Sequence, residues 1–195
     1  MPLPPELQRL LDDIDDSDRR GAAIASSCTD EQFCWRPRDG QGWSIAQCLD
    51  HLGVMNLVYG TAIRGGIEAA RRRGSTRRAP AKPGYIGGKF VQSMEPPVTR
   101  RLRTPRKGKP GPAKERGVIL EGYRAGHDLT RQLIADAATI DANGSRFKNP
   151  FLLLVRFSIA TGLFVIAAHD RRHLWQAEQV KHAPGFPSMR ATVTN

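Results

Sequence analysis

Apolar residues recur every three or four positions in four stretches of this chain of 195 residues, which is the spacing of the buried face of an amphipathic helix. The stretches are residues 5–27, a stretch that starts at residue 44, residues 115–139 and residues 151–179. No segment shows a convincing alternation of apolar and polar residues, the pattern typical of strands. The sequence therefore predicts an all-α four-helix bundle.

The second helix has the clearest start. In WSIAQCLDHL, residues 43–52, Ser44 is a good N-cap and Gln47 follows three residues later to complete a capping box. Trp43 and Cys48 stand at the two positions of a hydrophobic staple. The helical spacing places His51 on the inner stripe, whose other members are Cys48, Leu52, Met55, Tyr59 and Ala62.

The connection between the second and third helices is long. Residues 74–114 hold many of the prolines and glycines, and only residues 86–94 could form a short helix. Such a connection leaves room for a crossover in place of strict up-and-down order. Residues 34–42 are a second loop, and residues 141–150 break the chain, with Asn149 and Pro150 starting the last helix. We expect one domain over residues 1–182 and a flexible tail over residues 183–195.

Several features bear on the cellular location. The longest uncharged run, residues 157–168, has 12 residues, whereas a membrane-spanning helix needs about 20. The N-terminus is acidic and amphipathic, unlike a secretory signal. The cysteines Cys28, Cys34 and Cys48 form an odd and sparse set that favours free, structural thiols in a reducing compartment. We therefore expect a cytoplasmic protein without a membrane partner.

The positive charge is concentrated in one part of the chain. The whole chain has a net charge of +11, but residues 64–116 contain 16 of the 30 Lys and Arg residues and only 3 of the 19 acids, a net charge of +13. The runs RRRGSTRR (71–78) and RRLRTPRKGK (100–109) could neutralise nucleic-acid phosphates. Few aromatic residues accompany them, and no recognition motif is present. A solvated, mobile face is the simpler interpretation, and attraction of an anionic substrate is a third.

Three histidines are candidates for chemistry. His169 and His173 lie one helical turn apart on the stripe of Gly162, Gln176 and Val180, which faces the bundle interior. A pair with this spacing is more often hydrogen-bonded or solvated than bound to a metal. His51, however, is a third inward histidine from another helix. Three neutral imidazoles on two helices can hold one divalent metal ion and leave a coordination position open.

The segments WSIAQCLDHL at 43–52 and AAHDRRHLWQAEQV at 167–180 resemble the two signature segments of the DinB-like superfamily of bacterial four-helix proteins. That superfamily includes YfiT-like metal-dependent hydrolases and thiol-dependent S-transferases. The resemblance extends from about residue 5 to residue 180. It implies metal ligands at His51, His169 and His173, Ni²⁺ or Zn²⁺ as the ion, a low-molecular-weight thiol as a co-substrate, and a homodimer.

Such a metal site activates water as hydroxide or a thiol as thiolate, on a small-molecule substrate that the sequence does not identify. No residue stands out as the general acid or base. His127, Asp170 and Arg172 are candidates for supporting the ligands or contacting an anionic substrate, with a hydrogen-bonded core histidine as the simpler role of His127. Arg171 and Arg172 could instead pair with acids of the first helix. Trp43 and Trp175 are expected to pack against neighbouring helices. A nucleic-acid-binding module that uses the basic segment is the main alternative to an enzyme, and a non-catalytic metal-binding protein is another.

Overall fold

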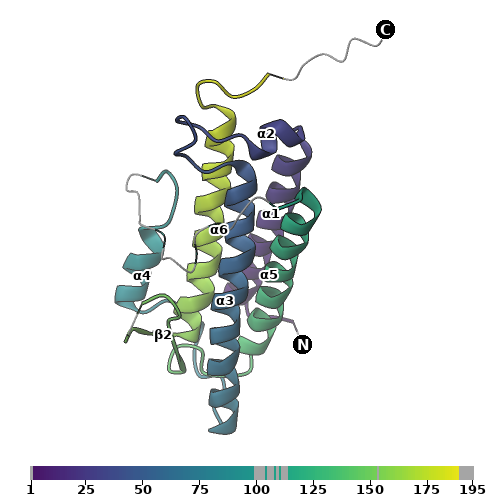
Figure 1. Ribbon diagram of the computed structural model, residues 1–195. Helices are drawn as coiled ribbons and strands as arrows, with labels where there is room; N and C mark the ends of the chain where they lie inside the picture. The colour runs from purple at the N-terminus through teal and green to yellow at the C-terminus, as the bar shows by residue number, and fades with distance from the viewer. Residues whose placement is uncertain are drawn as a thin grey trace.

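Four long helices form the body of the molecule. The computed structural model describes residues 2–98, 104, 108, 110, 114–152 and 154–188 (Figure 1). The long helices are α1 (Pro5–Ser26), α3 (Ile45–Arg72), α5 (Arg116–Ala137) and α6 (Ile159–Lys181). Two short helices, α2 (Asp30–Cys34) and α4 (Tyr85–Gln92), and an antiparallel pair of strands, β1 (Arg146–Lys148) and β2 (Arg156–Ser158), complete the described part of the chain. The predicted four-helix bundle is confirmed.

The four long helices do not alternate in direction. Gly53 of α3 lies against Gly122 of α5, and Gly60 lies against Leu129, so α3 and α5 run parallel. The long connection between them therefore returns the chain to the end of the bundle where α3 began, which is a crossover. α6 runs antiparallel to α3. Ile63, in the second half of α3, lies next to Gly162 near the start of α6, whereas His51, earlier in α3, lies next to His169 further along α6.

The predicted start of α3 is confirmed. The backbone N–H of Gln47 donates to Ser44 Oγ and the backbone N–H of Ser44 donates to Gln47 Oε1, each at 3.1 Å. Two of the otherwise unpaired N–H groups at the helix start are thereby satisfied. The same arrangement, made by Thr29 and Gln32, starts α2, a helix that the apolar pattern did not predict because it is only five residues long.

The predicted start of the last helix is wrong. α6 begins at Ile159 and not at residue 151, and the strands at 146–148 and 156–158 pair to form a hairpin. Asn149 does not start a helix: its Oδ1 accepts the backbone N–H groups of Phe151 and Leu152, which fixes a turn. Ser158 is the actual N-cap, accepting the backbone N–H of Thr161. The strands escaped prediction because three residues are too few to show an alternating pattern.

The interior consists of two apolar clusters with a polar layer between them. The first cluster includes Leu7 to Ile14 of α1, Tyr59 to Ala70 of α3 and Ile159 to Ala168 of α6. The second includes Ile24 and Ala25 of α1, Ile45, Ala46, Cys48, Leu49 and Leu52 of α3, and Leu174, Ala177 and Val180 of α6. Between them lie buried polar side chains from all four long helices: Ser17, His51, Asn56, His127, Thr130, Asp170, Arg172 and His173.

The structure bears on the predictions about membrane spans and about the cysteines. Among the described residues, no helix has the length and apolar character needed to cross a membrane. Cys28, Cys34 and Cys48 are free thiols, and Cys28 and Cys48 are buried in the second apolar cluster.

The close contact between α3 and α5 gives a prediction. A Cβ atom at Gly53 would lie 2.8 Å from the carbonyl carbon of Gly122, which is backbone and cannot move aside. We expect Gly53→Ala to lower the free energy of unfolding by about 1–3 kcal/mol despite the better helix propensity of alanine.

Gly65 provides the matched control in the same helix. Among the described residues, nothing lies within 4 Å of a Cβ atom built at Gly65, so Gly65→Ala should raise the free energy of unfolding by about 0.4–1 kcal/mol. Denaturant unfolding of both variants measures the difference. Equal effects at the two positions would contradict the packing of α3 on α5.

Candidate metal centre

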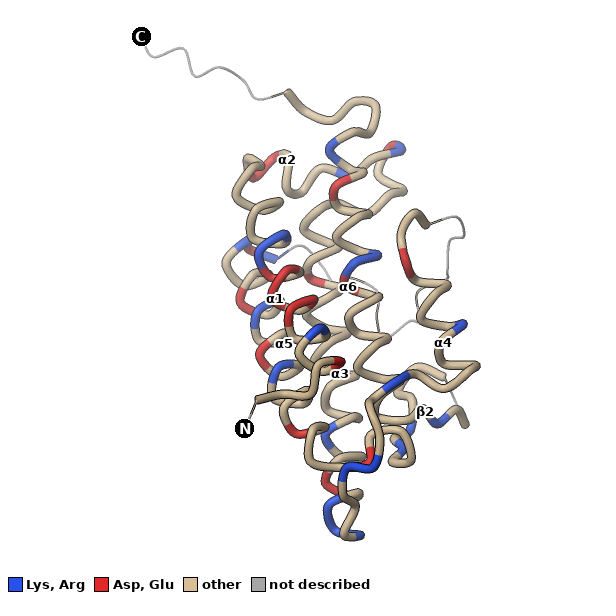
Figure 2. The backbone as a smooth tube through the Cα atoms, turned by 180° about the vertical axis from the view of Figure 1, so that it is seen from behind, with Lys and Arg blue, Asp and Glu red and all other residues tan. Residues whose placement is uncertain are grey.

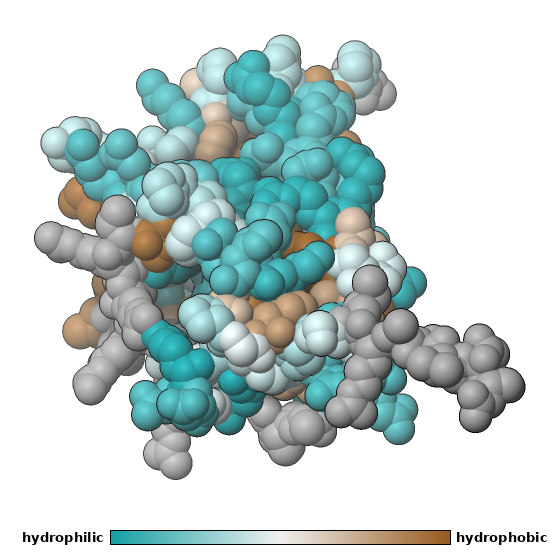
Figure 3. Space-filling view, turned by 90° about the horizontal axis from the view of Figure 1, so that it is seen from above, coloured by the Kyte–Doolittle hydropathy of each residue, from teal (hydrophilic) through white to brown (hydrophobic). Residues whose placement is uncertain are grey.

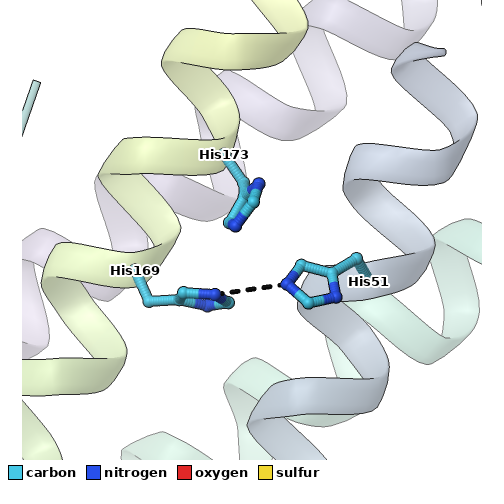
Figure 4. A group of neighbouring side chains, drawn as sticks. All are labelled: His51, His169 and His173. Carbon is cyan, nitrogen blue, oxygen red and sulfur yellow. Dashed lines mark hydrogen bonds between the residues drawn. The ribbon is translucent and has the colours of Figure 1, made fainter. Parts of the chain in front are cut away.

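The three predicted histidines come together in the polar layer. His51 projects from α3, and His169 and His173 project from consecutive turns of α6, so that the three rings face one another (Figure 4). One ring nitrogen of each histidine lies within 4.8 Å of the corresponding nitrogen of the other two. His51 and His173 are buried and His169 is partly buried. The group therefore offers three nitrogen ligands to one ion.

Hydrogen bonds to the outer nitrogens orient two of the rings. Nδ1 of His51 lies 2.5 Å from the carbonyl oxygen of Gly108, in the connection between α3 and α5. Nδ1 of His173 lies 3.0 Å from Oε1 of Gln176, one turn further along α6. Because both partners are oxygen acceptors, each Nδ1 carries the proton, and each Nε2 keeps a lone pair. Metal-binding histidines are commonly oriented in this way.

The separation of two of the inner nitrogens fits a shared metal ion. Nε2 of His51 and Nε2 of His169 are 3.2 Å apart. Two nitrogens that each lie about 2.0–2.1 Å from one Zn²⁺ ion at a tetrahedral angle are about 3.4 Å apart. Two lone pairs this close repel each other unless a proton or a cation lies between them. The donor set and its spacing thus fit a divalent metal ion.

The three imidazoles are held in the neutral form that binds metal. Burial lowers the pKa of His51 from 6.5 to about 4, although the Gly108 carbonyl and the charge of Asp50 raise it. Burial also lowers the pKa values of His169 and His173 well below 6.5, and the neighbouring rings and Arg172 lower them further. At pH 7 none of the three rings therefore carries a positive charge that would oppose the binding of a metal ion.

Trp43 forms one wall of the group. Its ring stacks on that of His173, with centroids 5.6 Å apart and an angle of 20°, and meets the ring of His51 at 4.9 Å. Trp43 immediately precedes the N-cap of α3, so the capping box that starts the helix also places the indole. Trp43 therefore contacts the candidate ligands themselves, a role that the expectation of helix packing did not include.

A cavity of about 840 Å³ adjoins the three histidines. It is lined along α3 by Met55 and Tyr59, along α6 from Val165 to Val180, and by residues of α4 and of the hairpin. Its volume lies in the range of small-molecule sites, about 300–1,000 Å³. From above, hydrophobic residues reach the surface near the centre, and hydrophilic residues cover most of the rest of this face (Figure 3).

A comparison with protein families matches residues 9–177 to the DinB superfamily, a region that includes all three histidines. The chain belongs to the DinB superfamily. The family expected from the segments around His51 and His169 is thereby confirmed. Comparisons with curated proteins and with solved structures each gave no significant match. Membership in the DinB superfamily leaves the substrate open.

In this DinB superfamily protein, the hydrogen bonds of Asp170 and His127 are made to residues other than the three histidines. The side chain of Asp170 is fully buried, accepting Asn56 Nδ2 at 2.9 Å and lying 3.2 Å from Nε2 of His127. His127 Nδ1 lies 2.7 Å from Asp18 of α1, which also accepts a hydrogen bond from Arg131. Asp170 thus links α6 to α3 and α5 beside the site, and His127 has the simpler role, a hydrogen-bonded core histidine.

The two arginines of the HDRRH segment have different surroundings. Arg171 pairs with Asp13 of α1 at 2.9 Å and with Glu95 at 2.6 Å, so the expected pairing with the first helix is confirmed for Arg171. Arg172 is buried, donates to the carbonyl of Ser93 at 3.4 Å and lines the cavity. Arg172 therefore brings positive charge to the cavity wall.

The basic segment is only partly described. Seen from behind, Lys and Arg residues gather at the lower end of the molecule, near the end of α3 and around β2 (Figure 2). Arg71 pairs with Asp136 and Arg77 pairs with Glu6, so part of the run at 71–78 contributes to the fold. Most of the run at 100–109 lies outside the described residues.

Sequence reasoning missed several residues of the site. The Gly108 carbonyl contacts His51, and the Asn56 amide contacts Asp170. Nothing in the sequence identifies Gly108 or Asn56 as part of the site. Gln176 was predicted only as a member of the inner stripe, yet its spacing of three from His173 is the signal that could have identified it as the acceptor of Nδ1.

The buried His127 gives a stability prediction. Replacing His127 by Leu removes the partner that two carboxylates share and leaves Asp170 buried with fewer hydrogen bonds. We expect the free energy of unfolding to fall by about 3–5 kcal/mol. Arg19→Ala, which removes an exposed ion pair with Asp16, is the control and should change it by less than about 1 kcal/mol. A loss below about 1 kcal/mol for His127→Leu would contradict the network.

The same residue gives a pH prediction. Burial alone would lower the pKa of His127, but Asp170 and Asp18 outweigh it and raise the pKa from 6.5 to about 9. The stability from charged His127 is therefore complete below pH 6.5 and lost as the pH rises through about 9. We expect the difference in unfolding free energy between the parent and His127→Leu to shrink from pH 6.5 to pH 9.5. A constant difference would show that His127 is neutral.

Proposed function

We propose that this protein is a metal-dependent enzyme in which His51, His169 and His173 hold a divalent ion, Zn²⁺ or Ni²⁺, and act on a small molecule bound in the adjoining cavity. One observation carries the proposal: neutral imidazoles from two helices converge beside a cavity large enough for a substrate. A metal ion bound there supplies Lewis acidity, which lowers the pKa of water or of a thiol.

The surroundings of the site favour a thiol over water as the nucleophile. Among the described residues, no Asp or Glu joins the three histidines, so no carboxylate stands ready as a general base for water. A thiol has a lower pKa than water and needs less help to lose its proton. No cysteine of the described chain joins the group either, so the thiol would come from a low-molecular-weight co-substrate.

We therefore infer an S-transferase, with a hydrolase as the alternative within the same site. The thiol sulfur would form a bond to an acceptor carbon while the leaving group departs with its electron pair and the thiol proton passes to solvent. The protein would orient the reactants: Trp43 and Gln176 hold the rings of His51 and His173, and Arg172 offers positive charge to an anionic group.

Metal content tests the first step of this proposal. The parent protein, purified without a histidine tag, should contain about one equivalent of Zn or Ni when its metal content is measured by inductively coupled plasma mass spectrometry. His169→Ala should lose at least about nine-tenths of it. His182→Ala is the control, because His182 lies beyond the end of α6 and outside the three-histidine group, and it should keep the metal. A parent protein that takes up no metal on incubation would overturn the proposal.

Activity tests the second step. The metal-loaded protein should accelerate the reaction of small thiols with 1-chloro-2,4-dinitrobenzene. The His169→Ala variant should catalyse this reaction at least about 100-fold more slowly. Activity that survives metal removal contradicts the proposal. Hydrolysis of nitrophenyl esters without any thiol reaction would select the hydrolase, and bound metal without turnover of either kind would select a non-catalytic metal-binding protein.

Two partner expectations remain predictions. The homodimer implied by the family resemblance can be tested by sedimentation. Nucleic-acid binding by the basic segment would appear as affinity for DNA that falls steeply with salt, and negligible affinity at low salt would exclude it.

A further inference from the structure

The cavity extends to both sides of the three histidines and differs in character between the sides. Because α3 and α6 are antiparallel, the residues after His51 and those before His169 line the same side. We call this side the apolar lobe; it is lined by Met55, Phe90, Met94, Phe151, Val165 and Ile166. The opposite side, the amide lobe, is lined by the polar residues Arg38, Gln41, Gln176 and Gln179 and by the apolar residues Pro37, Trp43, Trp175, Val180, Ala183 and Pro184.

The two asparagine amides that line the apolar lobe are engaged within the protein. Asn149 Nδ2 donates to Tyr59 Oη at 3.0 Å, and Asn149 Oδ1 accepts two backbone N–H groups of the turn. Asn56 Nδ2 donates to Asp170. Apart from Arg172, which donates to the Ser93 carbonyl beside Met94, the lobe offers a ligand mainly carbon and sulfur surface, which gains from contact with apolar groups.

Aromatic side chains shape the wall of this lobe. The ring of Phe151 is parallel to that of Tyr59, at an angle of 4° with centroids 6.1 Å apart, and Phe90 packs on Phe157 at 5.6 Å. Met55 and Met94 are adaptable side chains that pack well on rings. Flat, polarisable surfaces of this kind suit an aromatic group better than a branched polar one.

We propose that the apolar lobe binds an aromatic or other apolar group of the acceptor substrate, while the amide lobe takes the more polar co-substrate. This inference rests on the proposed function, since it places two reactants on either side of the metal. The amide lobe supports the division, because its glutamines and Arg38 can donate hydrogen bonds to a polar molecule. The cavity of about 840 Å³ accommodates both.

A neutral fluorescent probe tests the lobe without requiring turnover. N-phenyl-1-naphthylamine is uncharged, so the net charge of +11 does not attract it, and its fluorescence rises in apolar surroundings. The metal-loaded parent should bind it with saturation. Phe90→Asp should weaken binding at least about tenfold, because it places a charge in the apolar wall. Gln179→Ala, in the amide lobe, should leave the affinity unchanged.

Met55→Gln is a second variant, in which the new side chain has a volume similar to that of methionine. It tests the apolar lobe if circular dichroism shows that Phe90→Asp does not fold. It should weaken probe binding by about threefold or more. Unchanged affinity in the folded lobe variants, or an equal loss in Gln179→Ala, overturns the assignment.

Kinetics separate this inference from the proposed function. Met55→Gln should raise the KM for 1-chloro-2,4-dinitrobenzene and leave the KM for the small, polar electrophile iodoacetamide unchanged; equal increases count against the lobe. If the protein turns over neither electrophile but binds the probe as expected, the S-transferase proposal fails and the apolar lobe stands. If turnover occurs and the probe does not bind, the assignment of the apolar lobe fails and the S-transferase proposal stands.

Discussion

The structure depends on a layer of buried polar side chains that interrupts the apolar interior. Burying such groups costs free energy unless every one finds a hydrogen-bond partner. Here each long helix contributes side chains that act as partners. Asp170 of α6 is held by Asn56 of α3 and His127 of α5, and His127 reaches Asp18 of α1. Because these contacts have one geometry, a helix cannot rotate or slide by a turn without leaving a buried group unpaired. The layer thereby fixes the register of α3 against α6, on which the convergence of the histidines depends.

The histidines are prepared for a cation by the same burial. Their low pKa values keep the rings neutral, hydrogen bonds at Nδ1 orient the rings of His51 and His173, and Trp43 covers one side. The neighbouring Asp170 does not serve as a base because both of its oxygens are engaged in the layer. A site rich in metal ligands and poor in nearby bases is better suited to a nucleophile that gives up its proton easily. Family membership supports the metal site, while the shape and polarity of the cavity support the choice of reactants.

Much of the fold and the ligand set could be predicted because the signals are local. Ser44 and Gln47 mark a helix start, and the spacing of His169 and His173 places them on one face, since helical geometry alone decides both. The start of α6 was misplaced because Phe151 and Leu152 continue an apolar pattern that Asn149 interrupts through turn hydrogen bonds. Asn56 and Gly108 could not be found, because their roles come from contacts between segments more than 50 residues apart. Only tertiary packing brings those segments together.

The hydrogen bond from His51 to the Gly108 carbonyl has a consequence for the basic connection. One backbone atom of that connection helps to orient a candidate ligand, and a Cβ atom at residue 108 would lie 2.6 Å from the sulfur of Met55, so the chain is seated closely there. The seating of the connection at Gly108 is therefore linked to the orientation of the His51 ring. The basic connection thus contributes to the candidate centre through its backbone at Gly108 as well as through its charge.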